Sequence, residues 1–154
     1  GGHGAAAGVT LATERIDDFR RRVNEFYDSL QLKNQELYLL PRTDVEIDDF
    51  SEINEELVDN LAKMEPFGNG NAEPILKITE ATVLSVRRMG ADGQHVKLTL
   101  RDKNDVALQM LAFNAPEEFF REVGDEVSAW FQPTVNEWQG MKSVEGRLLH
   151  ISGV

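Results

Sequence analysis

The sequence predicts an α+β chain in which part of an α/β domain is followed by a small five-stranded β-barrel. From Ile75 onward, apolar and polar residues alternate with a period of two, which is typical of half-buried strands. Before the connector, apolar residues recur mainly at helical spacing. Residues 66–74 are dense in Gly, Asn and Pro, which favour turns. We therefore expect a first unit at residues 1–65, a connector at residues 66–74 and a barrel at residues 75–154.

The first unit opens on a glycine-rich loop. Its alanines favour a short helical turn, and we expect a short strand at residues 9–11 after it. A long amphipathic helix should begin at Thr13 or Glu14. Its apolar face consists of Ile16, Phe19, Val23, Phe26, Tyr27 and Leu30. The triplet of arginines at positions 20–22 falls within this helix, and we interpret it as a solvated face rather than as a phosphate contact.

Three further elements complete the first unit. Residues 37–40 and 45–47 favour short strands, the first of them ending at Pro41. An acidic helix should follow at residues 51–64, because Ser51 with Asn54 and Glu55 makes a suitable helix start.

The barrel is predicted from the number and order of its strands. The strands are expected at residues 75–88, 94–101, 106–113, 126–137 and 141–151. One short helix, at residues 116–123, should separate the third strand from the fourth. This is the layout of an OB-type barrel, whose sheet face and loops commonly bind oligonucleotides.

The second strand is the most informative stretch for binding. Alternation places Val96, Leu98 and Leu100 on one face and a basic set on the other. That set is His95, Lys97, Thr99 and Arg101, and the cations Arg87, Arg88, Lys142 and Arg147 could extend it into a track for a phosphate backbone. The alternative is that these are ordinary solvent-facing strand residues.

Two tryptophans could stack on bases. Trp130 lies in the apolar run Val127–Phe131, so we favour a place in the core for it. Trp138 lies at a turn beside Asn136, where stacking and a purely structural role are equally open.

The overall charge argues against a polyanion ligand, but its distribution weakens the objection. The net charge is −11, and residues 1–65 carry 7 basic and 15 acidic residues, a net charge of −8. Residues 66–154 carry 9 basic and 12 acidic residues, a net charge of −3. The chain has no cysteine and no apolar run long enough to span a membrane, so we expect a cytoplasmic protein with no membrane partner.

No hydrolytic site is visible in the sequence. The three histidines, at positions 3, 95 and 150, do not form a metal-ligand pattern with acidic residues. A nucleophile elbow, a phosphate-binding P-loop and a dinucleotide fingerprint are also missing. His3, in a loop before a helical turn, could bind an anion, although a lone histidine in such a loop usually has no special role. We expect no metal site and no cofactor in this chain.

Several stretches in order along the chain carry a family resemblance. They are Gly1-Gly2-His3, the turn Glu65-Pro66-Phe67-Gly68-Asn69-Gly70-Asn71-Ala72-Glu73-Pro74, His95-Val96-Lys97-Leu98, Ala112-Phe113-Asn114 and Asn136-Glu137-Trp138-Gln139-Gly140. Together they resemble the C-terminal part of the RecJ family, single-strand-specific 5′→3′ DNA exonucleases of the DHH phosphoesterase superfamily. The family usually has Pro where this chain has Ala72.

The resemblance implies a division of labour. Residues 1–65 would be the C-terminal part of the DHH-associated domain, in which Gly1, Gly2 and His3 hold the substrate phosphate and His3 is the catalytic-cleft residue. Residues 75–154 would be an OB domain that grips single-stranded DNA. The Mn²⁺ or Mg²⁺ of the intact enzyme would be bound by a separate DHH domain, a partner that we expect to be missing here. The chain alone should therefore not cleave DNA, and its truncated first unit should expose an edge that favours self-association.

Two other functions remain open from the sequence. The barrel could be a protein-interaction module, since its net charge is still negative. The intact protein could also be a DHH-family phosphodiesterase of nucleotides or short oligonucleotides, although such an enzyme has no obvious need for an extended strand grip.

Overall fold

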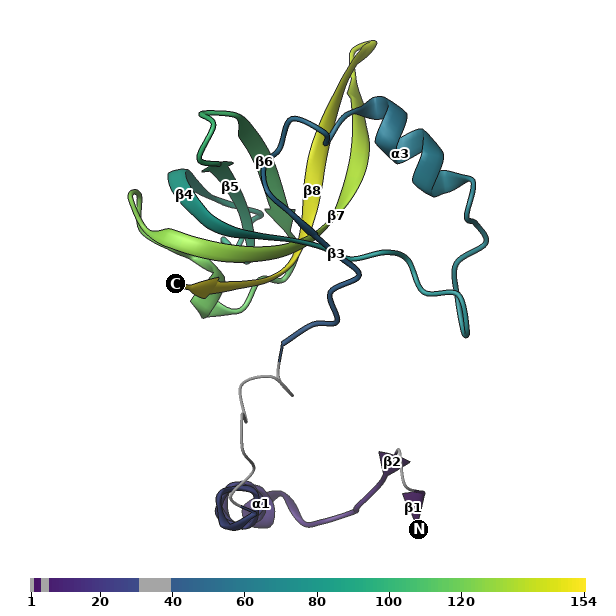
Figure 1. The fold of residues 1–154 in the computed structure, drawn as a ribbon. Coiled ribbons are helices and arrows are strands. Elements are labelled where there is room, and N and C mark those ends of the chain that lie inside the picture. The colour runs from purple at the N-terminus through teal and green to yellow at the C-terminus, as the bar shows by residue number, and fades with distance from the viewer. Residues whose placement is uncertain (1, 4–5, 31–39) are drawn as a thin grey trace. The chain divides into compact units, whose positions relative to one another are not determined.

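The structure is a computed structural model that describes residues 2–3, 6–30 and 40–154. The chain divides into two compact units, residues 1–39 and residues 40–154. Figure 1 shows the elements of each unit.

The N-terminal unit holds a short ladder and one long helix. β1 (Gly2–His3) pairs antiparallel with β2 (Ala6–Ala7). A 3-10 turn, η1 (Thr13–Arg15), leads into α1 (Ile16–Ser29). No residue of α1 is buried within the described part of this unit, so its apolar face is exposed. The self-association expected of this unit stays a prediction.

The start of this unit differs from the sequence-based expectation. The helical turn and the strand at residues 9–11 were wrong, because residues 6–7 are the strand and residues 9–11 have no regular structure. Ala6 and Ala7 form a strand because they pair with His3 and Gly2 of β1. Gly1 and most of the strand expected at residues 37–40 lie outside the described residues.

Ion pairs along α1 support the interpretation of the arginine triplet as a solvated face. Arg20 pairs with Asp17 at 3.0 Å. Arg21 pairs with Asp18 at 2.5 Å and with Glu25 at 2.8 Å. All five side chains are exposed and lie three or four positions apart, as neighbours on a helix surface do.

The C-terminal unit is a closed barrel of five strands within residues 40–154 (Figure 1). The strands are β4 (Leu76–Met89), β5 (His95–Arg101), β6 (Ala107–Ala112), β7 (Glu126–Trp138) and β8 (Met141–Gly153). They lie in the order β4–β5–β6–β8–β7, and β7 pairs back to β4 to close the barrel. Among the pairings of these five strands, only that of β6 with β8 is parallel. The predicted OB-type barrel is confirmed, with each strand within two residues of its expected bounds.

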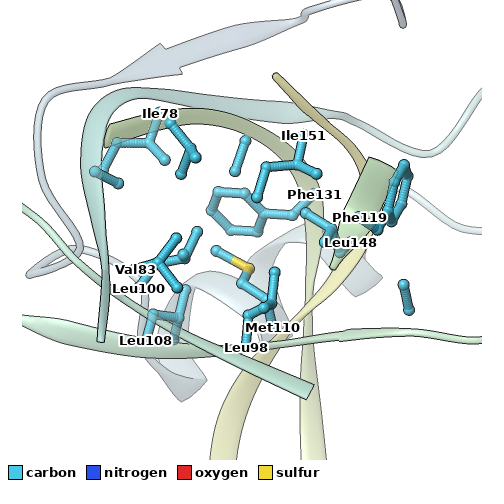
Figure 2. Packing of buried hydrophobic residues seen from close by; sticks show 14 of the residues in the cluster. Ile78, Val83, Leu98, Leu100, Leu108, Met110, Phe119, Phe131, Leu148 and Ile151 are labelled. Carbon is cyan, nitrogen blue, oxygen red and sulfur yellow. The ribbon is translucent and has the colours of Figure 1, made fainter. Parts of the chain in front are cut away.

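Alternation along the strands fills the barrel interior. Phe131 of β7 lies near the middle of the packed side chains, among residues from all five strands (Figure 2). The largest fully buried members are Ile78, Val83, Val96, Leu98, Leu100, Met110, Val127, Phe131 and Ile151. Burial of these side chains is the main stabilising contribution to the unit.

The helix expected at residues 116–123 was wrong in extent, because only the 3-10 turn η2 (Glu117–Phe119) forms. Phe119 is buried in the core, whereas the ring of its neighbour Phe120 lies under the guanidinium of Arg88, 3.6 Å from the ring centroid. Two adjacent rings anchored at different places turn the chain out of helical geometry at Phe120, whose ψ is 78°.

Residues 40–65 pack onto the barrel, although the sequence grouped them with the first unit. β3 (Val45–Ile47) is confirmed as a strand and pairs parallel with β4. Phe50 and Ile53 belong to the hydrophobic core, and the Phe50 ring lies edge-on to Phe131 at 6.2 Å. The compact unit therefore begins at residue 40, not at the connector.

The acidic helix α3 (Glu55–Ala62) is shorter than the expected 51–64. Asn54 is its N-cap, because its side chain accepts a hydrogen bond from the Leu57 N–H at 3.0 Å. Ser51 does not start the helix, since its N–H and hydroxyl both donate to the carboxylate of Asp49.

Candidate nucleic-acid interface

The outer face of the barrel brings two of the predicted cations together. β5 alternates as expected, with Val96, Leu98 and Leu100 buried and Lys97 on the outer face. Lys97 lies across from Leu111 of β6, and Leu111 lies across from Arg147 of β8. Lys97 and Arg147, 50 positions apart in the sequence, therefore belong to one row across three strands.

A groove of about 320 Å³ runs beside this row, between β6 and the β7–β8 hairpin. It is lined by Leu111, Phe113, Thr134, Val135, Asn136, Glu145, Gly146 and Arg147. In OB barrels, the face of the second and third strands and the adjoining loops are where oligonucleotides bind. The groove lies beside the third strand of the barrel, β6, and against the hairpin that provides the last of those loops.

Phe113 is the aromatic side chain at the groove that sequence reasoning did not select. It is 65% exposed and packs edge-on against His95, with ring centroids 5.2 Å apart. The backbone N–H of Asn114 donates to His95 Nδ1 at 3.0 Å, which leaves Nε2 to carry the proton of the neutral ring. The alternation along β6 could have identified Phe113 from the sequence, because Leu111 and Phe113 are apolar residues at the outward positions that follow Gln109.

β7 and β8 form a long hairpin (Figure 1). Trp138 is the last residue of β7 and therefore lies at the tip of this hairpin. It pairs with Met141, and each side chain is 69% exposed. By alternation along the two strands, Trp138 and Met141 share the face that carries Asn136 and Glu145. An exposed tryptophan, an exposed phenylalanine and the groove thus belong to one face of the barrel.

Carboxylates neutralise both cations of the row. Glu145 pairs with Lys97 at 3.3 Å and also accepts a hydrogen bond from Asn136 Nδ2 at 3.3 Å. Arg147 pairs with Glu73 of the connector at 2.6 Å. Arg147 also donates to the side-chain oxygen of Gln132, from Nε at 3.1 Å and from Nη2. Glu145 is only 6% exposed, so it is a buried carboxylate on a face that the sequence suggested was basic.

The other predicted cations lie in different surroundings. Arg87 lies across from Lys97 and is exposed, and no carboxylate approaches it within 4.0 Å in the part of the chain that the structure describes. Arg88, its neighbour on the other face of β4, pairs with Glu117 at 2.6 Å. Of these cations, Arg87 is the one that adds to the face.

Arg101 and Lys142 are placed apart from the groove. Arg101 lies at the opposite end of β5 from His95 and pairs with Asp105 at 3.3 Å. Lys142 lies across from Glu137, on the face of the hairpin opposite to Trp138.

Trp130 is buried, as the sequence indicated, at 3% exposure. Its indole N–H donates to the Thr43 hydroxyl at 2.8 Å, and the Lys77 ammonium lies 5.3 Å from the ring centroid. His150 packs edge-on against it at 5.2 Å, and burial lowers the pKa of that imidazole below its ordinary value. Trp130 is therefore structural, and Trp138 is the exposed tryptophan.

His3 lies in β1, and its side chain is outside the described part of the chain, as is Gly1. Among the described residues, no group of three or more His, Cys, Asp or Glu side chains could hold a metal ion. No helix in residues 2–3, 6–30 or 40–154 is both long and apolar enough to cross a membrane.

The strand order and this face define an OB-fold domain. Residues 43–150 match the RecJ OB domain family, and the chain belongs to that family. The match begins close to residue 40, where the compact unit starts. The resemblance to RecJ is thereby confirmed.

Two curated relatives are single-stranded-DNA-specific exonucleases called RecJ. The protein from Bacillus subtilis is 32% identical over 143 residues, which cover 92% of this chain and 18% of that protein. The protein from Haemophilus influenzae is 26% identical over 147 residues, which cover 94% of this chain and 25% of that protein. The chain thus spans about a fifth to a quarter of the length of these relatives.

Two solved structures of Thermus thermophilus RecJ share the fold. The structure in complex with Mn²⁺ matches with a TM-score of 0.58 at 23% identity and covers all of this chain and 22% of that one. The structure in complex with Mg²⁺ matches with a TM-score of 0.54 at 19% identity over 92% of this chain and 21% of that one.

Proposed function

We propose that residues 40–154 bind single-stranded DNA on the outer face of β5, β6 and the β7–β8 hairpin, as the strand-gripping domain of a RecJ-type exonuclease. The observation that carries the proposal is the groove between Leu111 and Glu145, with Phe113 beside it and Trp138 on the same face. The relatives are named for their specificity for single-stranded DNA, which agrees with a site built from stacking surfaces.

Bases would stack on the two exposed rings. Phe113 and Trp138 each present most of a ring face or edge to solvent, although a soluble domain usually buries such side chains. Base stacking on an aromatic side chain contributes about 1–3 kcal/mol per base and tolerates any sequence. Arg87, on the same outer face, is available for one phosphate.

For the whole enzyme, we propose 5′→3′ hydrolysis of single-stranded DNA in repair and recombination. The metal-dependent step belongs to a DHH domain outside this sequence, and Gly1, Gly2 and His3 of the DHH-associated domain would hold the substrate phosphate. The described residues offer no group of ligands for a metal ion. We expect the isolated chain to show no nuclease turnover with Mn²⁺ or Mg²⁺, and turnover above a buffer control would contradict this.

The binding proposal is tested by anisotropy of a labelled twelve-nucleotide thymidine strand, with wild type, Phe113→Ala and Trp138→Ala. Each variant should bind about 5- to 150-fold more weakly, the equivalent of ~1–3 kcal/mol for one stacked base. Val123→Ala is the matched control, because Val123 is an equally exposed apolar side chain in the loop before β7.

Equal affinity of all four proteins would remove this face from the site. If the groove binds a protein partner and not DNA, the labelled strand should not bind at all. Binding of such a partner through apolar contacts would barely respond to salt.

A further inference from the structure

The two cations beside the groove, Lys97 and Arg147, are each paired with a carboxylate. Lys97 is held by Glu145 at 3.3 Å, and Arg147 is held by Glu73 at 2.6 Å. The two carboxylates come from distant parts of the sequence, 48 and 74 positions from their partners. Both pairs are therefore products of the fold and not of local sequence.

Glu145 lies at a position where its negative charge disfavours a phosphate. It is 6% exposed on the groove wall, and its carboxylate is satisfied by Lys97 and by Asn136. A buried carboxylate is costly unless it is paired, and it repels a second anion brought close to it. A phosphate entering the groove would have to displace Glu145 from Lys97 or Glu73 from Arg147.

The remaining lining suits a neutral, flat group. Leu111, Phe113 and Val135 supply apolar surface, and Thr134 and Asn136 supply hydrogen-bonding groups. Arg87, with no carboxylate within 4.0 Å among the described residues, lies across β5 from the groove. The face thus separates a base-binding groove from a cation that is free for the backbone.

We infer that Glu145 and Glu73 determine which part of the strand enters the groove: unstacked bases are accepted and phosphates are kept outside. This rests on the proposed function and adds an orientation to it, with bases turned toward the barrel and the backbone on the solvent side. Affinity then comes mainly from stacking, and binding responds weakly to salt.

Three twelve-nucleotide probes test the orientation with the wild-type chain: a thymidine strand, an abasic phosphodiester strand and a thymine strand with a neutral methylphosphonate backbone. The abasic strand should bind about 25-fold or more weaker than the thymidine strand, since each of two stacked bases contributes about fivefold or more. The affinity for the neutral strand should lie within about fivefold of the affinity for the thymidine strand, because one exposed charge contact contributes about this much at most. The logarithm of affinity against the logarithm of salt concentration should have a slope of about −0.7, the value for one phosphate contact on a single strand.

Glu145→Gln and Glu73→Gln test the role of the carboxylates. Each amide keeps an oxygen for the hydrogen bonds but frees one cation, so the salt slope should steepen by about 0.7 in each variant. Affinity for the thymidine strand at low salt should rise about two- to fivefold. Glu137→Gln is the matched control, because Glu137 is an exposed carboxylate on the opposite face of the same hairpin and should change neither quantity beyond the loss of one net charge.

Each outcome decides between the two proposals. If the abasic strand binds as tightly as the thymidine strand, or if both glutamine variants keep the wild-type slope, the inference is overturned while binding of single-stranded DNA stands. If the wild type binds none of the strands, the proposed function fails and the inference fails with it. The probe comparison needs no variant, and Glu73 is a surface side chain, so poor folding of Glu145→Gln would not prevent a decision.

Discussion

The carboxylate of Asp102 joins residues 40–65 to the barrel, and its removal should destabilise the C-terminal unit. Asp102 is buried at the end of β5 and accepts three backbone hydrogen bonds. Oδ2 accepts from the Phe50 N–H at 2.6 Å, across 52 positions of the sequence. Oδ1 accepts from the N–H groups of Asn104 at 2.8 Å and Val106 at 2.9 Å, which close the β5–β6 turn.

Two substitutions separate these contributions. Asp102→Asn keeps an oxygen for the turn and sets an amide NH₂ against the Phe50 N–H, so a buried donor loses its acceptor at a cost of about 1–3 kcal/mol. Asp102→Ala removes all three hydrogen bonds, but the two N–H groups of the turn are partly exposed and regain water. We expect a loss of about 2–5 kcal/mol for the alanine variant.

Urea unfolding followed by fluorescence of Trp130 measures both losses. Trp130 is a suitable reporter because its hydrogen bond to Thr43 lies at the junction of residues 40–65 with the barrel. The control is Asp105→Asn, which alters an exposed carboxylate of the same turn and should change stability by less than about 0.5 kcal/mol. If Asp102→Asn unfolds within that margin of the wild type, the reasoning on the buried acceptor is refuted.

Three further predictions concern stability. Gly146→Ala should destabilise the unit by about 1–3 kcal/mol, because a Cβ there would overlap the Met110 sulfur and lie 3.0 Å from the Phe131 ring, which is seen as a lower urea midpoint. Asn54→Ala should cost about 1 kcal/mol through loss of the α3 cap, measured in the same way. Burial lowers the pKa of His150, so the unfolded chain binds the proton more readily; stability is full above about pH 6.5 and is lost as the pH falls below it. A His150→Gln variant should show a smaller decrease of the urea midpoint between pH 7.5 and 5.5 than the wild type, and an equal decrease would contradict this.

The barrel could be predicted because its strands alternate cleanly. In β5, every second residue from Val96 to Leu100 is apolar and buried, and no competing helical pattern exists there. Turn-favouring residues between the strands, glycine in some turns and Asp and Asn in the β5–β6 turn, then indicate the strand ends within two residues. The place of residues 40–65 was not predictable in the same way, since it depends on the edge-on packing of Phe50 against Phe131 and on the hydrogen bond from the Phe50 N–H to Asp102. Neither contact produces a local pattern in the sequence.

The position of the candidate site could be predicted from the sequence, but the charge of the face that carries it could not. Alternation placed Lys97 on the outer face correctly, and the second strand of an OB barrel is where a ligand is expected. The partners of Lys97 and Arg147 could not be read from the sequence, because Glu145 and Glu73 reach them only through strand order and the path of the connector.

These ion pairs also bear on how an acidic chain could hold a polyanion. The net charge of −11 opposes a long row of phosphate contacts. The outer face does not provide such a row, because Lys97 and Arg147 are each paired with a carboxylate. Of the three cations Arg87, Lys97 and Arg147, only Arg87 has no carboxylate within 4.0 Å among the described residues. Stacking on Phe113 and Trp138 needs no excess of positive charge. The proposed function then implies that a strand held by its bases, with few phosphate contacts, moves along the face without breaking many ion pairs at once.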